Sequence, residues 1–256
     1  MRLLQLLPFA KVQYGKSCTL PDDKLLVSSD GLTDLGIFVT DDFTFDSHIN
    51  QIACKANVKC SWILSVFYTR DFRPMLTLFK SLVLNILEYC CPLWAPHQVQ
   101  GISRLEGVQR RFTSKIAGIQ HLDYWKRLEV LNLMSLQRRR ERYILLYAWK
   151  ILHEKVPNDV GLTWHDNLRR GKVATIPRVP SSVAKINTSC DHFFKVKAGK
   201  LWNCLPKAVN SKDSLASFKE ALDLFLKDIP DRPPVAGYST ANHNSLLDWL
   251  SYRNAF

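Results

Sequence analysis

The sequence predicts a mainly α fold: a helical bundle with a small N-terminal antiparallel β element and a short C-terminal helical piece. Its 256 residues are 46% hydrophobic and 23% charged, which is typical of globular domains. Apolar residues recur at three- and four-residue intervals through residues 46–155, as they do in amphipathic helices. Turn residues and short apolar runs are concentrated in residues 1–45 instead. These three observations together predict strands first and helices second.

The first segment, residues 1–45, is expected to form short strands. Three candidates are residues 11–14, 24–27 and 35–39, separated by Gly15, by the Pro21-Asp22-Asp23 turn and by Gly31. They predict a small antiparallel element at the N-terminal end of the bundle.

Residues 46–155 are expected to form the helical region. Asp46 or Ser47 can cap the first helix, and Pro74 suits the start of the second. The last helix is apolar almost all round in residues 143–152, which indicates that this part is buried. The expected helices cover residues 46–66, 74–89, 102–116, 124–131 and 136–154.

The remainder divides into three segments. Residues 156–191 are rich in turn residues and are expected to form a long loop with one short strand at residues 173–176. Residues 192–229 are expected to form the C-terminal helical piece, with an amphipathic helix at residues 215–229. Residues 230–256 are a tail to which no structure is assigned.

The net charge of +12 is concentrated in one part of the chain. Residues 1–100 contain 9 basic and 9 acidic side chains, whereas residues 101–150 contain 11 basic and 4 acidic ones. Basic stripes on helices can bind phosphate backbones, but they can equally be solvated helix faces. The charge pattern alone leaves both interpretations open.

No catalytic or metal site is predicted. The acidic pairs Asp22-Asp23 and Asp41-Asp42 lack the aromatic residue two positions upstream that marks polymerase motifs, and they suit turns and strand ends. Nucleotide-binding, nucleophile and zinc motifs are absent from the sequence, and the seven cysteines lack metal-ligand spacing. His48, near a helix start, is expected to be structural.

The sequence indicates an intracellular protein, in the nucleus or the cytoplasm, that is neither secreted nor bound to a membrane. Pro8 interrupts the leucine run that follows Arg2, so the N-terminus does not suit a signal peptide. An odd number of scattered cysteines favours reduced thiols. The most apolar stretch, residues 74–96, contains Lys80, Asn85 and Glu88 and is unsuited to a membrane span.

Several short motifs, taken in order, resemble the C-terminal part of reverse transcriptases from non-LTR (LINE-like, jockey/CR1-type) retrotransposons. The resemblance covers about residues 11–228. It is carried by residues 34–37 (DLGI), 87–90 (LEYC) with 92–94 (PLW), 108–113 (VQRRFT), 201–203 (LWN) with Leu205-Pro206, and 217–219 (SFK).

The resemblance implies that residues 1–45 are the end of the polymerase palm, with Leu35 and Gly36 in a hairpin similar to the primer grip. Residues 46–155 would be thumb-like and would hold an RNA template and a DNA primer strand. The residues expected to contact the nucleic-acid backbone are Arg104, Arg110, Arg111, Lys115, Arg138, Arg139 and Arg142. The intact family enzyme would use Mg²⁺, but the segments with its catalytic aspartates are not matched in this sequence. This chain is therefore expected to be a truncated polymerase that binds nucleic acid, needs no cofactor and does not polymerise DNA alone.

Two alternatives remain open at the level of the sequence. The chain could be a host-retained helical module that binds a protein partner and has no role with nucleic acid, or a piece of an active polymerase. Four tryptophans could serve a core or an interface, and a core is expected: Trp62, Trp94, Trp149 and Trp202.

Overall fold

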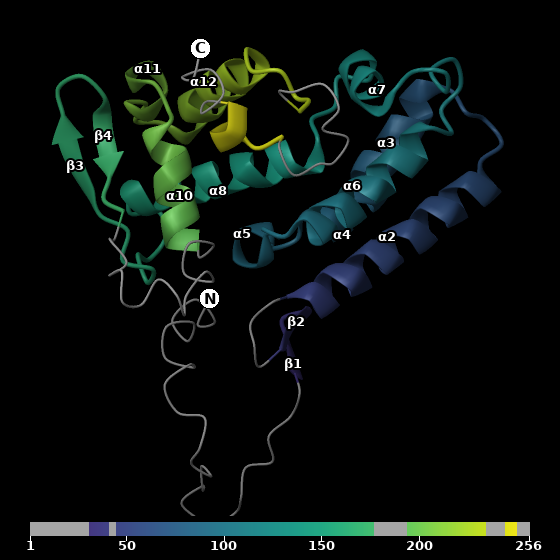
Figure 1. Ribbon diagram of the computed structural model, residues 1–256, viewed down its shortest axis with the longest axis horizontal. Coiled ribbons are helices and arrows are strands. Elements are labelled where there is room, and N and C mark those ends of the chain that lie inside the picture. Colours follow the sequence, from purple (N-terminus) through teal and green to yellow (C-terminus); the bar gives the residue numbers. More distant parts are fainter. Residues whose placement is uncertain (1–30, 41–44, 177–193, 234–243, 250–256) are drawn as a thin grey trace, which may run out of the picture.

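A computed structural model describes residues 31–40, 45–176, 194–233 and 244–249 of the chain. It confirms the mainly α fold with small antiparallel elements. Figure 1 shows two groups of helices side by side, which we call the N-terminal lobe (residues 31–134) and the C-terminal lobe (residues 135–249).

The N-terminal lobe begins with two short strands and continues as helices. Its elements are β1 (Gly31–Asp34), β2 (Ile37–Thr40), α2 (Asp46–Val66), α3 (Phe72–Leu82), α4 (Leu84–Glu88), α5 (Cys91–Trp94), α6 (Val99–Thr113) and α7 (Tyr124–Val130). The C-terminal lobe contains α8 (Leu136–Leu152), β3 (Trp164–Asn167), β4 (Gly171–Ala174), α10 (Phe194–Asn203), α11 (Lys207–Asn210) and α12 (Leu215–Lys227).

The strand expected at residues 35–39 is found as β2, which pairs antiparallel with β1. Leu35 and Gly36 form the two-residue turn between them, with φ angles of 47° and 82°. Positive φ at both central residues is the geometry that closes a tight hairpin. The other two expected strands, residues 11–14 and 24–27, lie outside the described residues, as do the pairs Asp22-Asp23 and Asp41-Asp42.

The helix expected from Asp46 to Val66 is confirmed as α2. Its buried positions include Ile49, Ile52, Ala56 and Ile63, which follow the helical repeat of one face. Within the described part of the chain, none of the helices has the length and apolar character that crossing a membrane requires.

The helix expected at residues 74–89 is interrupted at Val83. The side-chain amide of Asn85 donates to the backbone carbonyl of Ser81 at 2.7 Å, across the interruption. Asparagine side chains that bond to the nearby backbone are unfavourable in helix interiors. The segment forms two shorter helices, α3 and α4.

The hydrophobic core has two parts, which meet within α8. The first part contains apolar residues from Ile37 to Leu136, and the second contains residues from Ile144 to Leu246. Residues 143–152 are buried largely as expected, because α8 packs against α5, α6, α10 and α12. The core therefore divides inside this helix, and the division does not follow the expected segment boundary at residue 155.

The segment expected to be a long loop contains a β-hairpin. Strands β3 and β4 pair from Trp164↔Ala174 to Asn167↔Gly171, so the second strand lies close to the expected position of residues 173–176. The first strand was not predicted, because its sequence, WHDN, has one large apolar residue and ends in a turn former. Trp202 of α10 donates its indole N–H to the carbonyl of Lys172 at 2.8 Å and anchors the hairpin.

Candidate nucleic-acid interface

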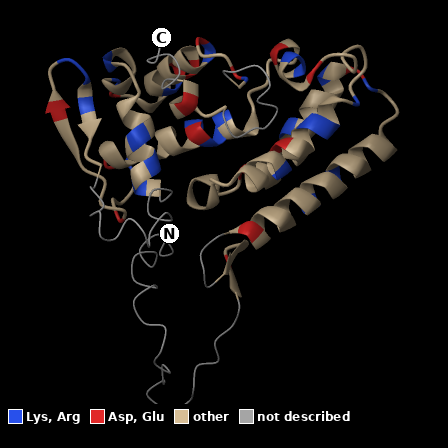
Figure 2. Ribbon diagram, in the orientation of Figure 1, with Lys and Arg blue, Asp and Glu red and all other residues tan. Residues whose placement is uncertain are grey.

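Three of the predicted cations lie on α6 or directly after it: Arg104 and Arg111 within the helix, and Lys115 in the turn that follows Thr113. The side chains of all three are exposed. The spacing of seven residues places Arg104 and Arg111 about 20° apart around the helix. None of them takes part in the four ion pairs found among the described residues. We call this set the α6 stripe; Figure 2 shows Lys and Arg positions along the helix in blue.

The neighbouring helix α2 orients the central member of the α6 stripe. Arg111 donates from Nη2 to Oδ1 of Asn57 at 2.8 Å and from Nε to the carbonyl of Gly107 at 3.3 Å. Neither partner is charged, so the guanidinium keeps its full positive charge while its direction is fixed. No local pattern predicts the role of Asn57, because it lies 54 positions before Arg111 in the chain.

Arg110 lies apart from the α6 stripe and is half-buried. Its guanidinium carbon stands 4.8 Å from the ring centroid of Tyr124, a cation–π arrangement. Its Nε atom is buried. Arg110 therefore supports the packing of α7 on α6.

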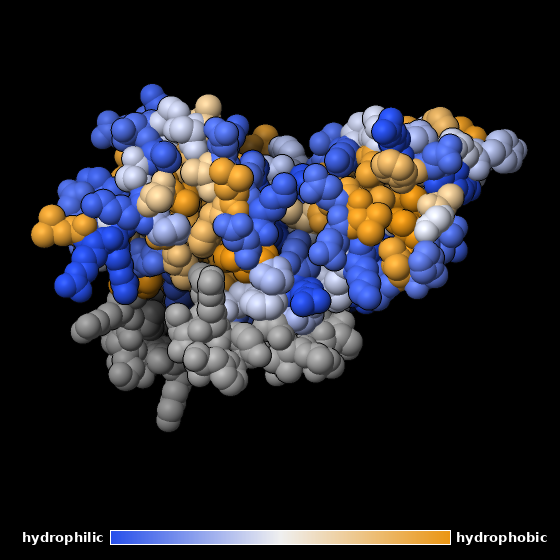
Figure 3. Space-filling view, turned by 90° about the horizontal axis from the view of Figure 1, so that it is seen from above, coloured by the Kyte–Doolittle hydropathy of each residue, from blue (hydrophilic) through white to orange (hydrophobic). Residues whose placement is uncertain are grey.

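Two arginines of α8 form bidentate ion pairs beside a cleft of about 1770 Å³ between the lobes. Arg139 binds both carboxylate oxygens of Glu88, with an Nη2–Oε2 distance of 2.9 Å. Arg142 binds both oxygens of Asp223, with an Nη2–Oδ2 distance of 2.8 Å. These contacts raise the pKa of both guanidinium groups against the effect of burial. Figure 3 shows mostly hydrophilic residues around the gap between the lobes. Acidic side chains neutralise these two predicted cations.

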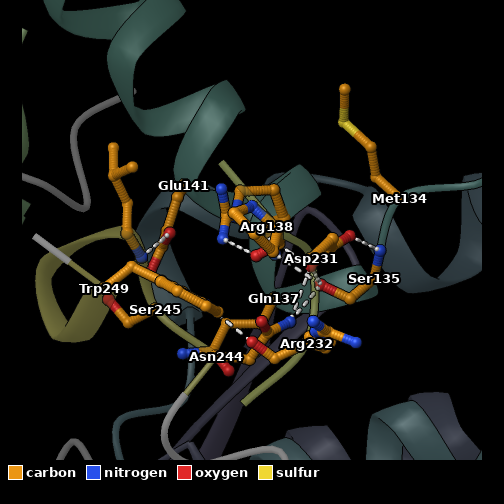
Figure 4. Close-up of polar contacts among 12 residues, drawn as sticks. Met134, Ser135, Gln137, Arg138, Glu141, Asp231, Arg232, Asn244, Ser245 and Trp249 are labelled. Atoms are coloured by element: carbon orange, nitrogen blue, oxygen red, sulfur yellow. Dashed lines mark hydrogen bonds and ion pairs between the residues drawn. The ribbon is translucent and has the colours of Figure 1, made fainter. Parts of the chain in front are cut away.

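Arg138, the remaining predicted cation, is buried, with an exposed fraction of 1%. Its Nη2 atom donates to the carbonyl of Pro230 at 3.3 Å, and its Nε atom lies 4.0 Å from Oδ1 of Asp231. Figure 4 shows residues from the end of the described chain covering the first turn of α8, where Arg138 lies. This arginine supports the fold and does not reach the surface.

A buried ionic cluster between the lobes was missed at the level of the sequence. Glu106 accepts hydrogen bonds from the hydroxyl of Tyr124 and from the backbone N–H of Gln137, the latter at 2.8 Å. Burial raises the pKa of Glu106 and lowers that of Arg140, although the two charges attract each other. Glu141 accepts from the backbone N–H of Leu246 at 2.9 Å. One feature of the sequence could have indicated this cluster. The second half of α8 is apolar almost all round, which predicts a central helix, and charged residues on a central helix must be buried and paired.

The residues expected to resemble a primer grip, Leu35 and Gly36, form the tip of the β1–β2 hairpin. Leu35 is 68% exposed, and its carbonyl accepts a hydrogen bond from the hydroxyl of Tyr89 at 3.2 Å. Within β2 the hairpin is held by His48, whose Nδ1 atom accepts from the backbone N–H of Phe38 at 3.2 Å. The buried His48 thus has a structural role in this chain.

The tryptophans divide between core and surface. Trp94, Trp149 and Trp202 are at most 2% exposed, whereas Trp62 is 48% exposed.

The described residues contain no group of three or more His, Cys, Asp or Glu side chains that could hold a metal ion.

Comparison with known proteins gives one relative to report, at low identity. The chain is 27% identical over 124 residues to the uncharacterized protein B0403.1 of Caenorhabditis elegans. The matched region covers 47% of this chain and 63% of the worm protein, so the chain spans less than two thirds of that relative. No family model matches the chain. No solved structure matches it either.

Proposed function

We propose that this chain binds the phosphate backbone of nucleic acid through the α6 stripe. The observation that carries the proposal is the set Arg104, Arg111 and Lys115 on α6 and in the turn after it, whose side chains are all exposed and take part in no ion pair among the described residues. Arg104 and Arg111 lie seven residues apart, or about 10 Å along the helix, which corresponds to roughly three phosphates along the axis of one strand.

The proposal narrows the predicted set of seven cations to three. Arg138 is buried, Arg139 and Arg142 are held by carboxylates, and Arg110 stands over an aromatic ring. A phosphate would have to displace existing partners to reach those four side chains. It would meet the α6 stripe directly.

The motif resemblance to non-LTR reverse transcriptases supplies the class of ligand. By that resemblance, the N-terminal lobe would be the thumb-like part of an RNA-directed DNA polymerase and would hold an RNA template paired with a DNA primer. The proposal covers backbone binding alone and assigns no catalytic step to this chain.

A reducing compartment, the nucleus or the cytoplasm, suits this role. Cys54, Cys60, Cys90, Cys91 and Cys204 are free thiols. Burial raises the pKa of Cys60 and Cys91 to about 12, which makes both thiols unreactive.

A second candidate function, binding of a protein partner, is favoured by the outer face of α2. Val58, Trp62 and Val66 lie four residues apart and are 70%, 48% and 49% exposed. Large exposed apolar side chains at helical spacing are typical of interaction surfaces. If this were the main function, the W62S variant would lose a protein partner, while substitutions in the α6 stripe would have no effect.

The proposed function is tested by fluorescence anisotropy with a labelled RNA·DNA hybrid at low salt. The R104A/R111A/K115A variant is expected to bind more weakly than the wild-type chain by at least tenfold. A control with the same change in net charge is K219A/K227A/R232A, because these three side chains are also exposed. Equal losses in both variants would reduce the effect to net charge and would contradict a specific α6 interface.

A further inference from the structure

The tip of the β3–β4 hairpin exposes two arginines and one leucine. Leu168 is 95% exposed, and Arg169 and Arg170 are both exposed. The nearby Lys172 forms an ion pair with Asp166 at 2.8 Å, but the two arginines take part in none of the ion pairs found among the described residues. In Figure 2 this tip is the blue loop at the end of the hairpin. We call these three residues the hairpin tip.

The backbone of the hairpin tip is held firmly although its side chains protrude. Asn167 accepts hydrogen bonds at its side-chain oxygen from the backbone N–H groups of Arg169 and Arg170, both at 3.0 Å. Gly171 has a φ of 75°, which completes a three-residue hairpin loop. The conformation is therefore defined within the loop itself.

Two further side chains tie the hairpin tip to the C-terminal lobe. Lys207 donates from Nζ to the carbonyl of Leu168 at 3.0 Å. Asn210 donates from Nδ2 to the carbonyl of Arg170 at 2.7 Å. Because the loop is ordered in the folded chain, binding through it would cost little further conformational entropy.

We propose that the hairpin tip binds in a groove of a nucleic-acid duplex. Arg169 and Arg170 bind phosphates on either side of the groove, and Leu168 packs against the bases between them. A two-stranded β-ribbon is narrow enough to enter the major groove of B-DNA, and apolar side chains of minor-groove-binding proteins wedge between base steps. The inference rests on the nucleic-acid binding proposed above and adds a second contact from the other lobe.

The chemistry of the hairpin tip favours a duplex over an anionic membrane. A membrane surface would also attract the two arginines, but stable membrane binding requires considerable buried apolar area. Leu168 is the single exposed apolar side chain of the three-residue loop, and its neighbours are charged or polar. One leucine suits a contact with a base step better than insertion into a bilayer.

The test measures binding of a labelled RNA·DNA hybrid by fluorescence anisotropy over a series of salt concentrations. For R169A/R170A, the slope of log K against log salt is expected to fall by about 1.4–1.8, since each lost phosphate contact removes about 0.7–0.9. L168A is expected to weaken binding about threefold to tenfold with the slope unchanged, because the lost contact is not ionic. Thermal melting of each variant should match that of the wild-type chain.

The outcomes separate this inference from the proposed function. The control K219A/K227A removes the same charge from the exposed side of α12. The hairpin inference is contradicted if R169A/R170A and K219A/K227A show the same slope of log K against log salt. If R104A/R111A/K115A still lowers that slope, the α6 interface stands. If the wild-type chain does not bind the hybrid at all, both are contradicted. Sedimentation with phosphatidylserine vesicles that depends on Leu168, together with an unchanged hybrid slope, would assign the hairpin tip to membranes and overturn the inference.

Discussion

The carboxylate of Asp231 caps the start of α8 by accepting hydrogen bonds from both the backbone N–H and the hydroxyl of Ser135, 96 residues earlier in the chain. Asn244 donates to the same carboxylate at 2.7 Å and to the hydroxyl of Ser135 at 2.9 Å. Ser135 in turn accepts from the backbone N–H of Arg138 at 3.1 Å, as a helix cap does. The end of the described chain thus fastens the first turn of the helix that joins the two parts of the core.

We expect D231A to lower the free energy of unfolding by about 1–3 kcal/mol, because it leaves buried donors of Ser135 and Asn244 without an acceptor. Urea denaturation measures this change. The control D228A removes an exposed carboxylate just after α12 and should change the free energy of unfolding by less than about 0.5 kcal/mol. Equal stabilities for the two variants would contradict the proposed cap.

Stability should fall in acid because His48 must stay neutral to accept from the backbone N–H of Phe38. Burial, assisted by the charge of Lys55, lowers the pKa of His48 from its ordinary value of 6.5. A lowered pKa in the folded state contributes stability above pH 6.5, and this contribution is lost as the pH falls through the folded-state pKa.

The variant H48N tests this pH dependence, because Oδ1 of asparagine can accept at the position of Nδ1 without titrating. Its free energy of unfolding, measured by urea denaturation between pH 5 and 7.5, should depend less on pH than that of the wild-type chain. Parallel pH profiles for the two proteins would show that His48 is not the titrating group.

The two hairpin glycines should differ in their tolerance of alanine. Gly36 has a φ of 82° and open space where a Cβ would stand, so G36A meets only the backbone strain of about 1 kcal/mol. At Gly171, with a φ of 75°, a Cβ would lie 2.5 Å from Oδ1 of Asn210. G171A should therefore lower the midpoint of thermal unfolding more than G36A does, and the reverse order would contradict the described anchoring of the hairpin tip.

Alanine variants of Arg138 and Arg111 should differ in effect: R138A should reduce stability, and R111A should reduce nucleic-acid binding. R138A is expected to lower the free energy of unfolding by about 3 kcal/mol or more, since it removes the cation with the largest charge effect on the buried Glu141 and breaks the ion pair with Asp231. R111A should change it by less than about 1 kcal/mol, because its side chain is exposed. Urea denaturation and hybrid binding, measured on both variants, check the assignment. A stable R138A variant that binds the hybrid poorly would contradict this assignment and would show that Arg138 contacts nucleic acid.

Much of the fold could be predicted from the sequence, because the helices of the N-terminal lobe carry regular apolar stripes. Asp46–Val66, with Ile49, Ile52, Ala56 and Ile63 inward, is the clearest case. The predicted continuous helix at residues 74–89 was wrong, because the helix is interrupted at Val83, where the side chain of Asn85 bonds to the carbonyl of Ser81. The apolar repeat continues through this point and so does not show the interruption.

The candidate site was predicted less completely, because the sequence does not show which acidic side chains lie next to a given arginine in the folded chain. Arg104, Arg111 and Lys115 are exposed, as residues expected to contact a nucleic-acid backbone must be. The α8 arginines follow the same basic pattern, yet Glu88 and Asp223 neutralise Arg139 and Arg142 from positions 51 and 81 residues away. Only the packing of α8 between the lobes brings those carboxylates close.

The central claim is that the α6 stripe binds phosphates, and the salt dependence of hybrid binding tests it most directly. For the wild-type chain and R104A/R111A/K115A, the slope of log K against log salt is measured by anisotropy on the same RNA·DNA hybrid. We predict a slope that is smaller in the variant by about 2.1–2.7, from three lost contacts of about 0.7–0.9 each. Equal slopes for the two proteins would contradict the claim.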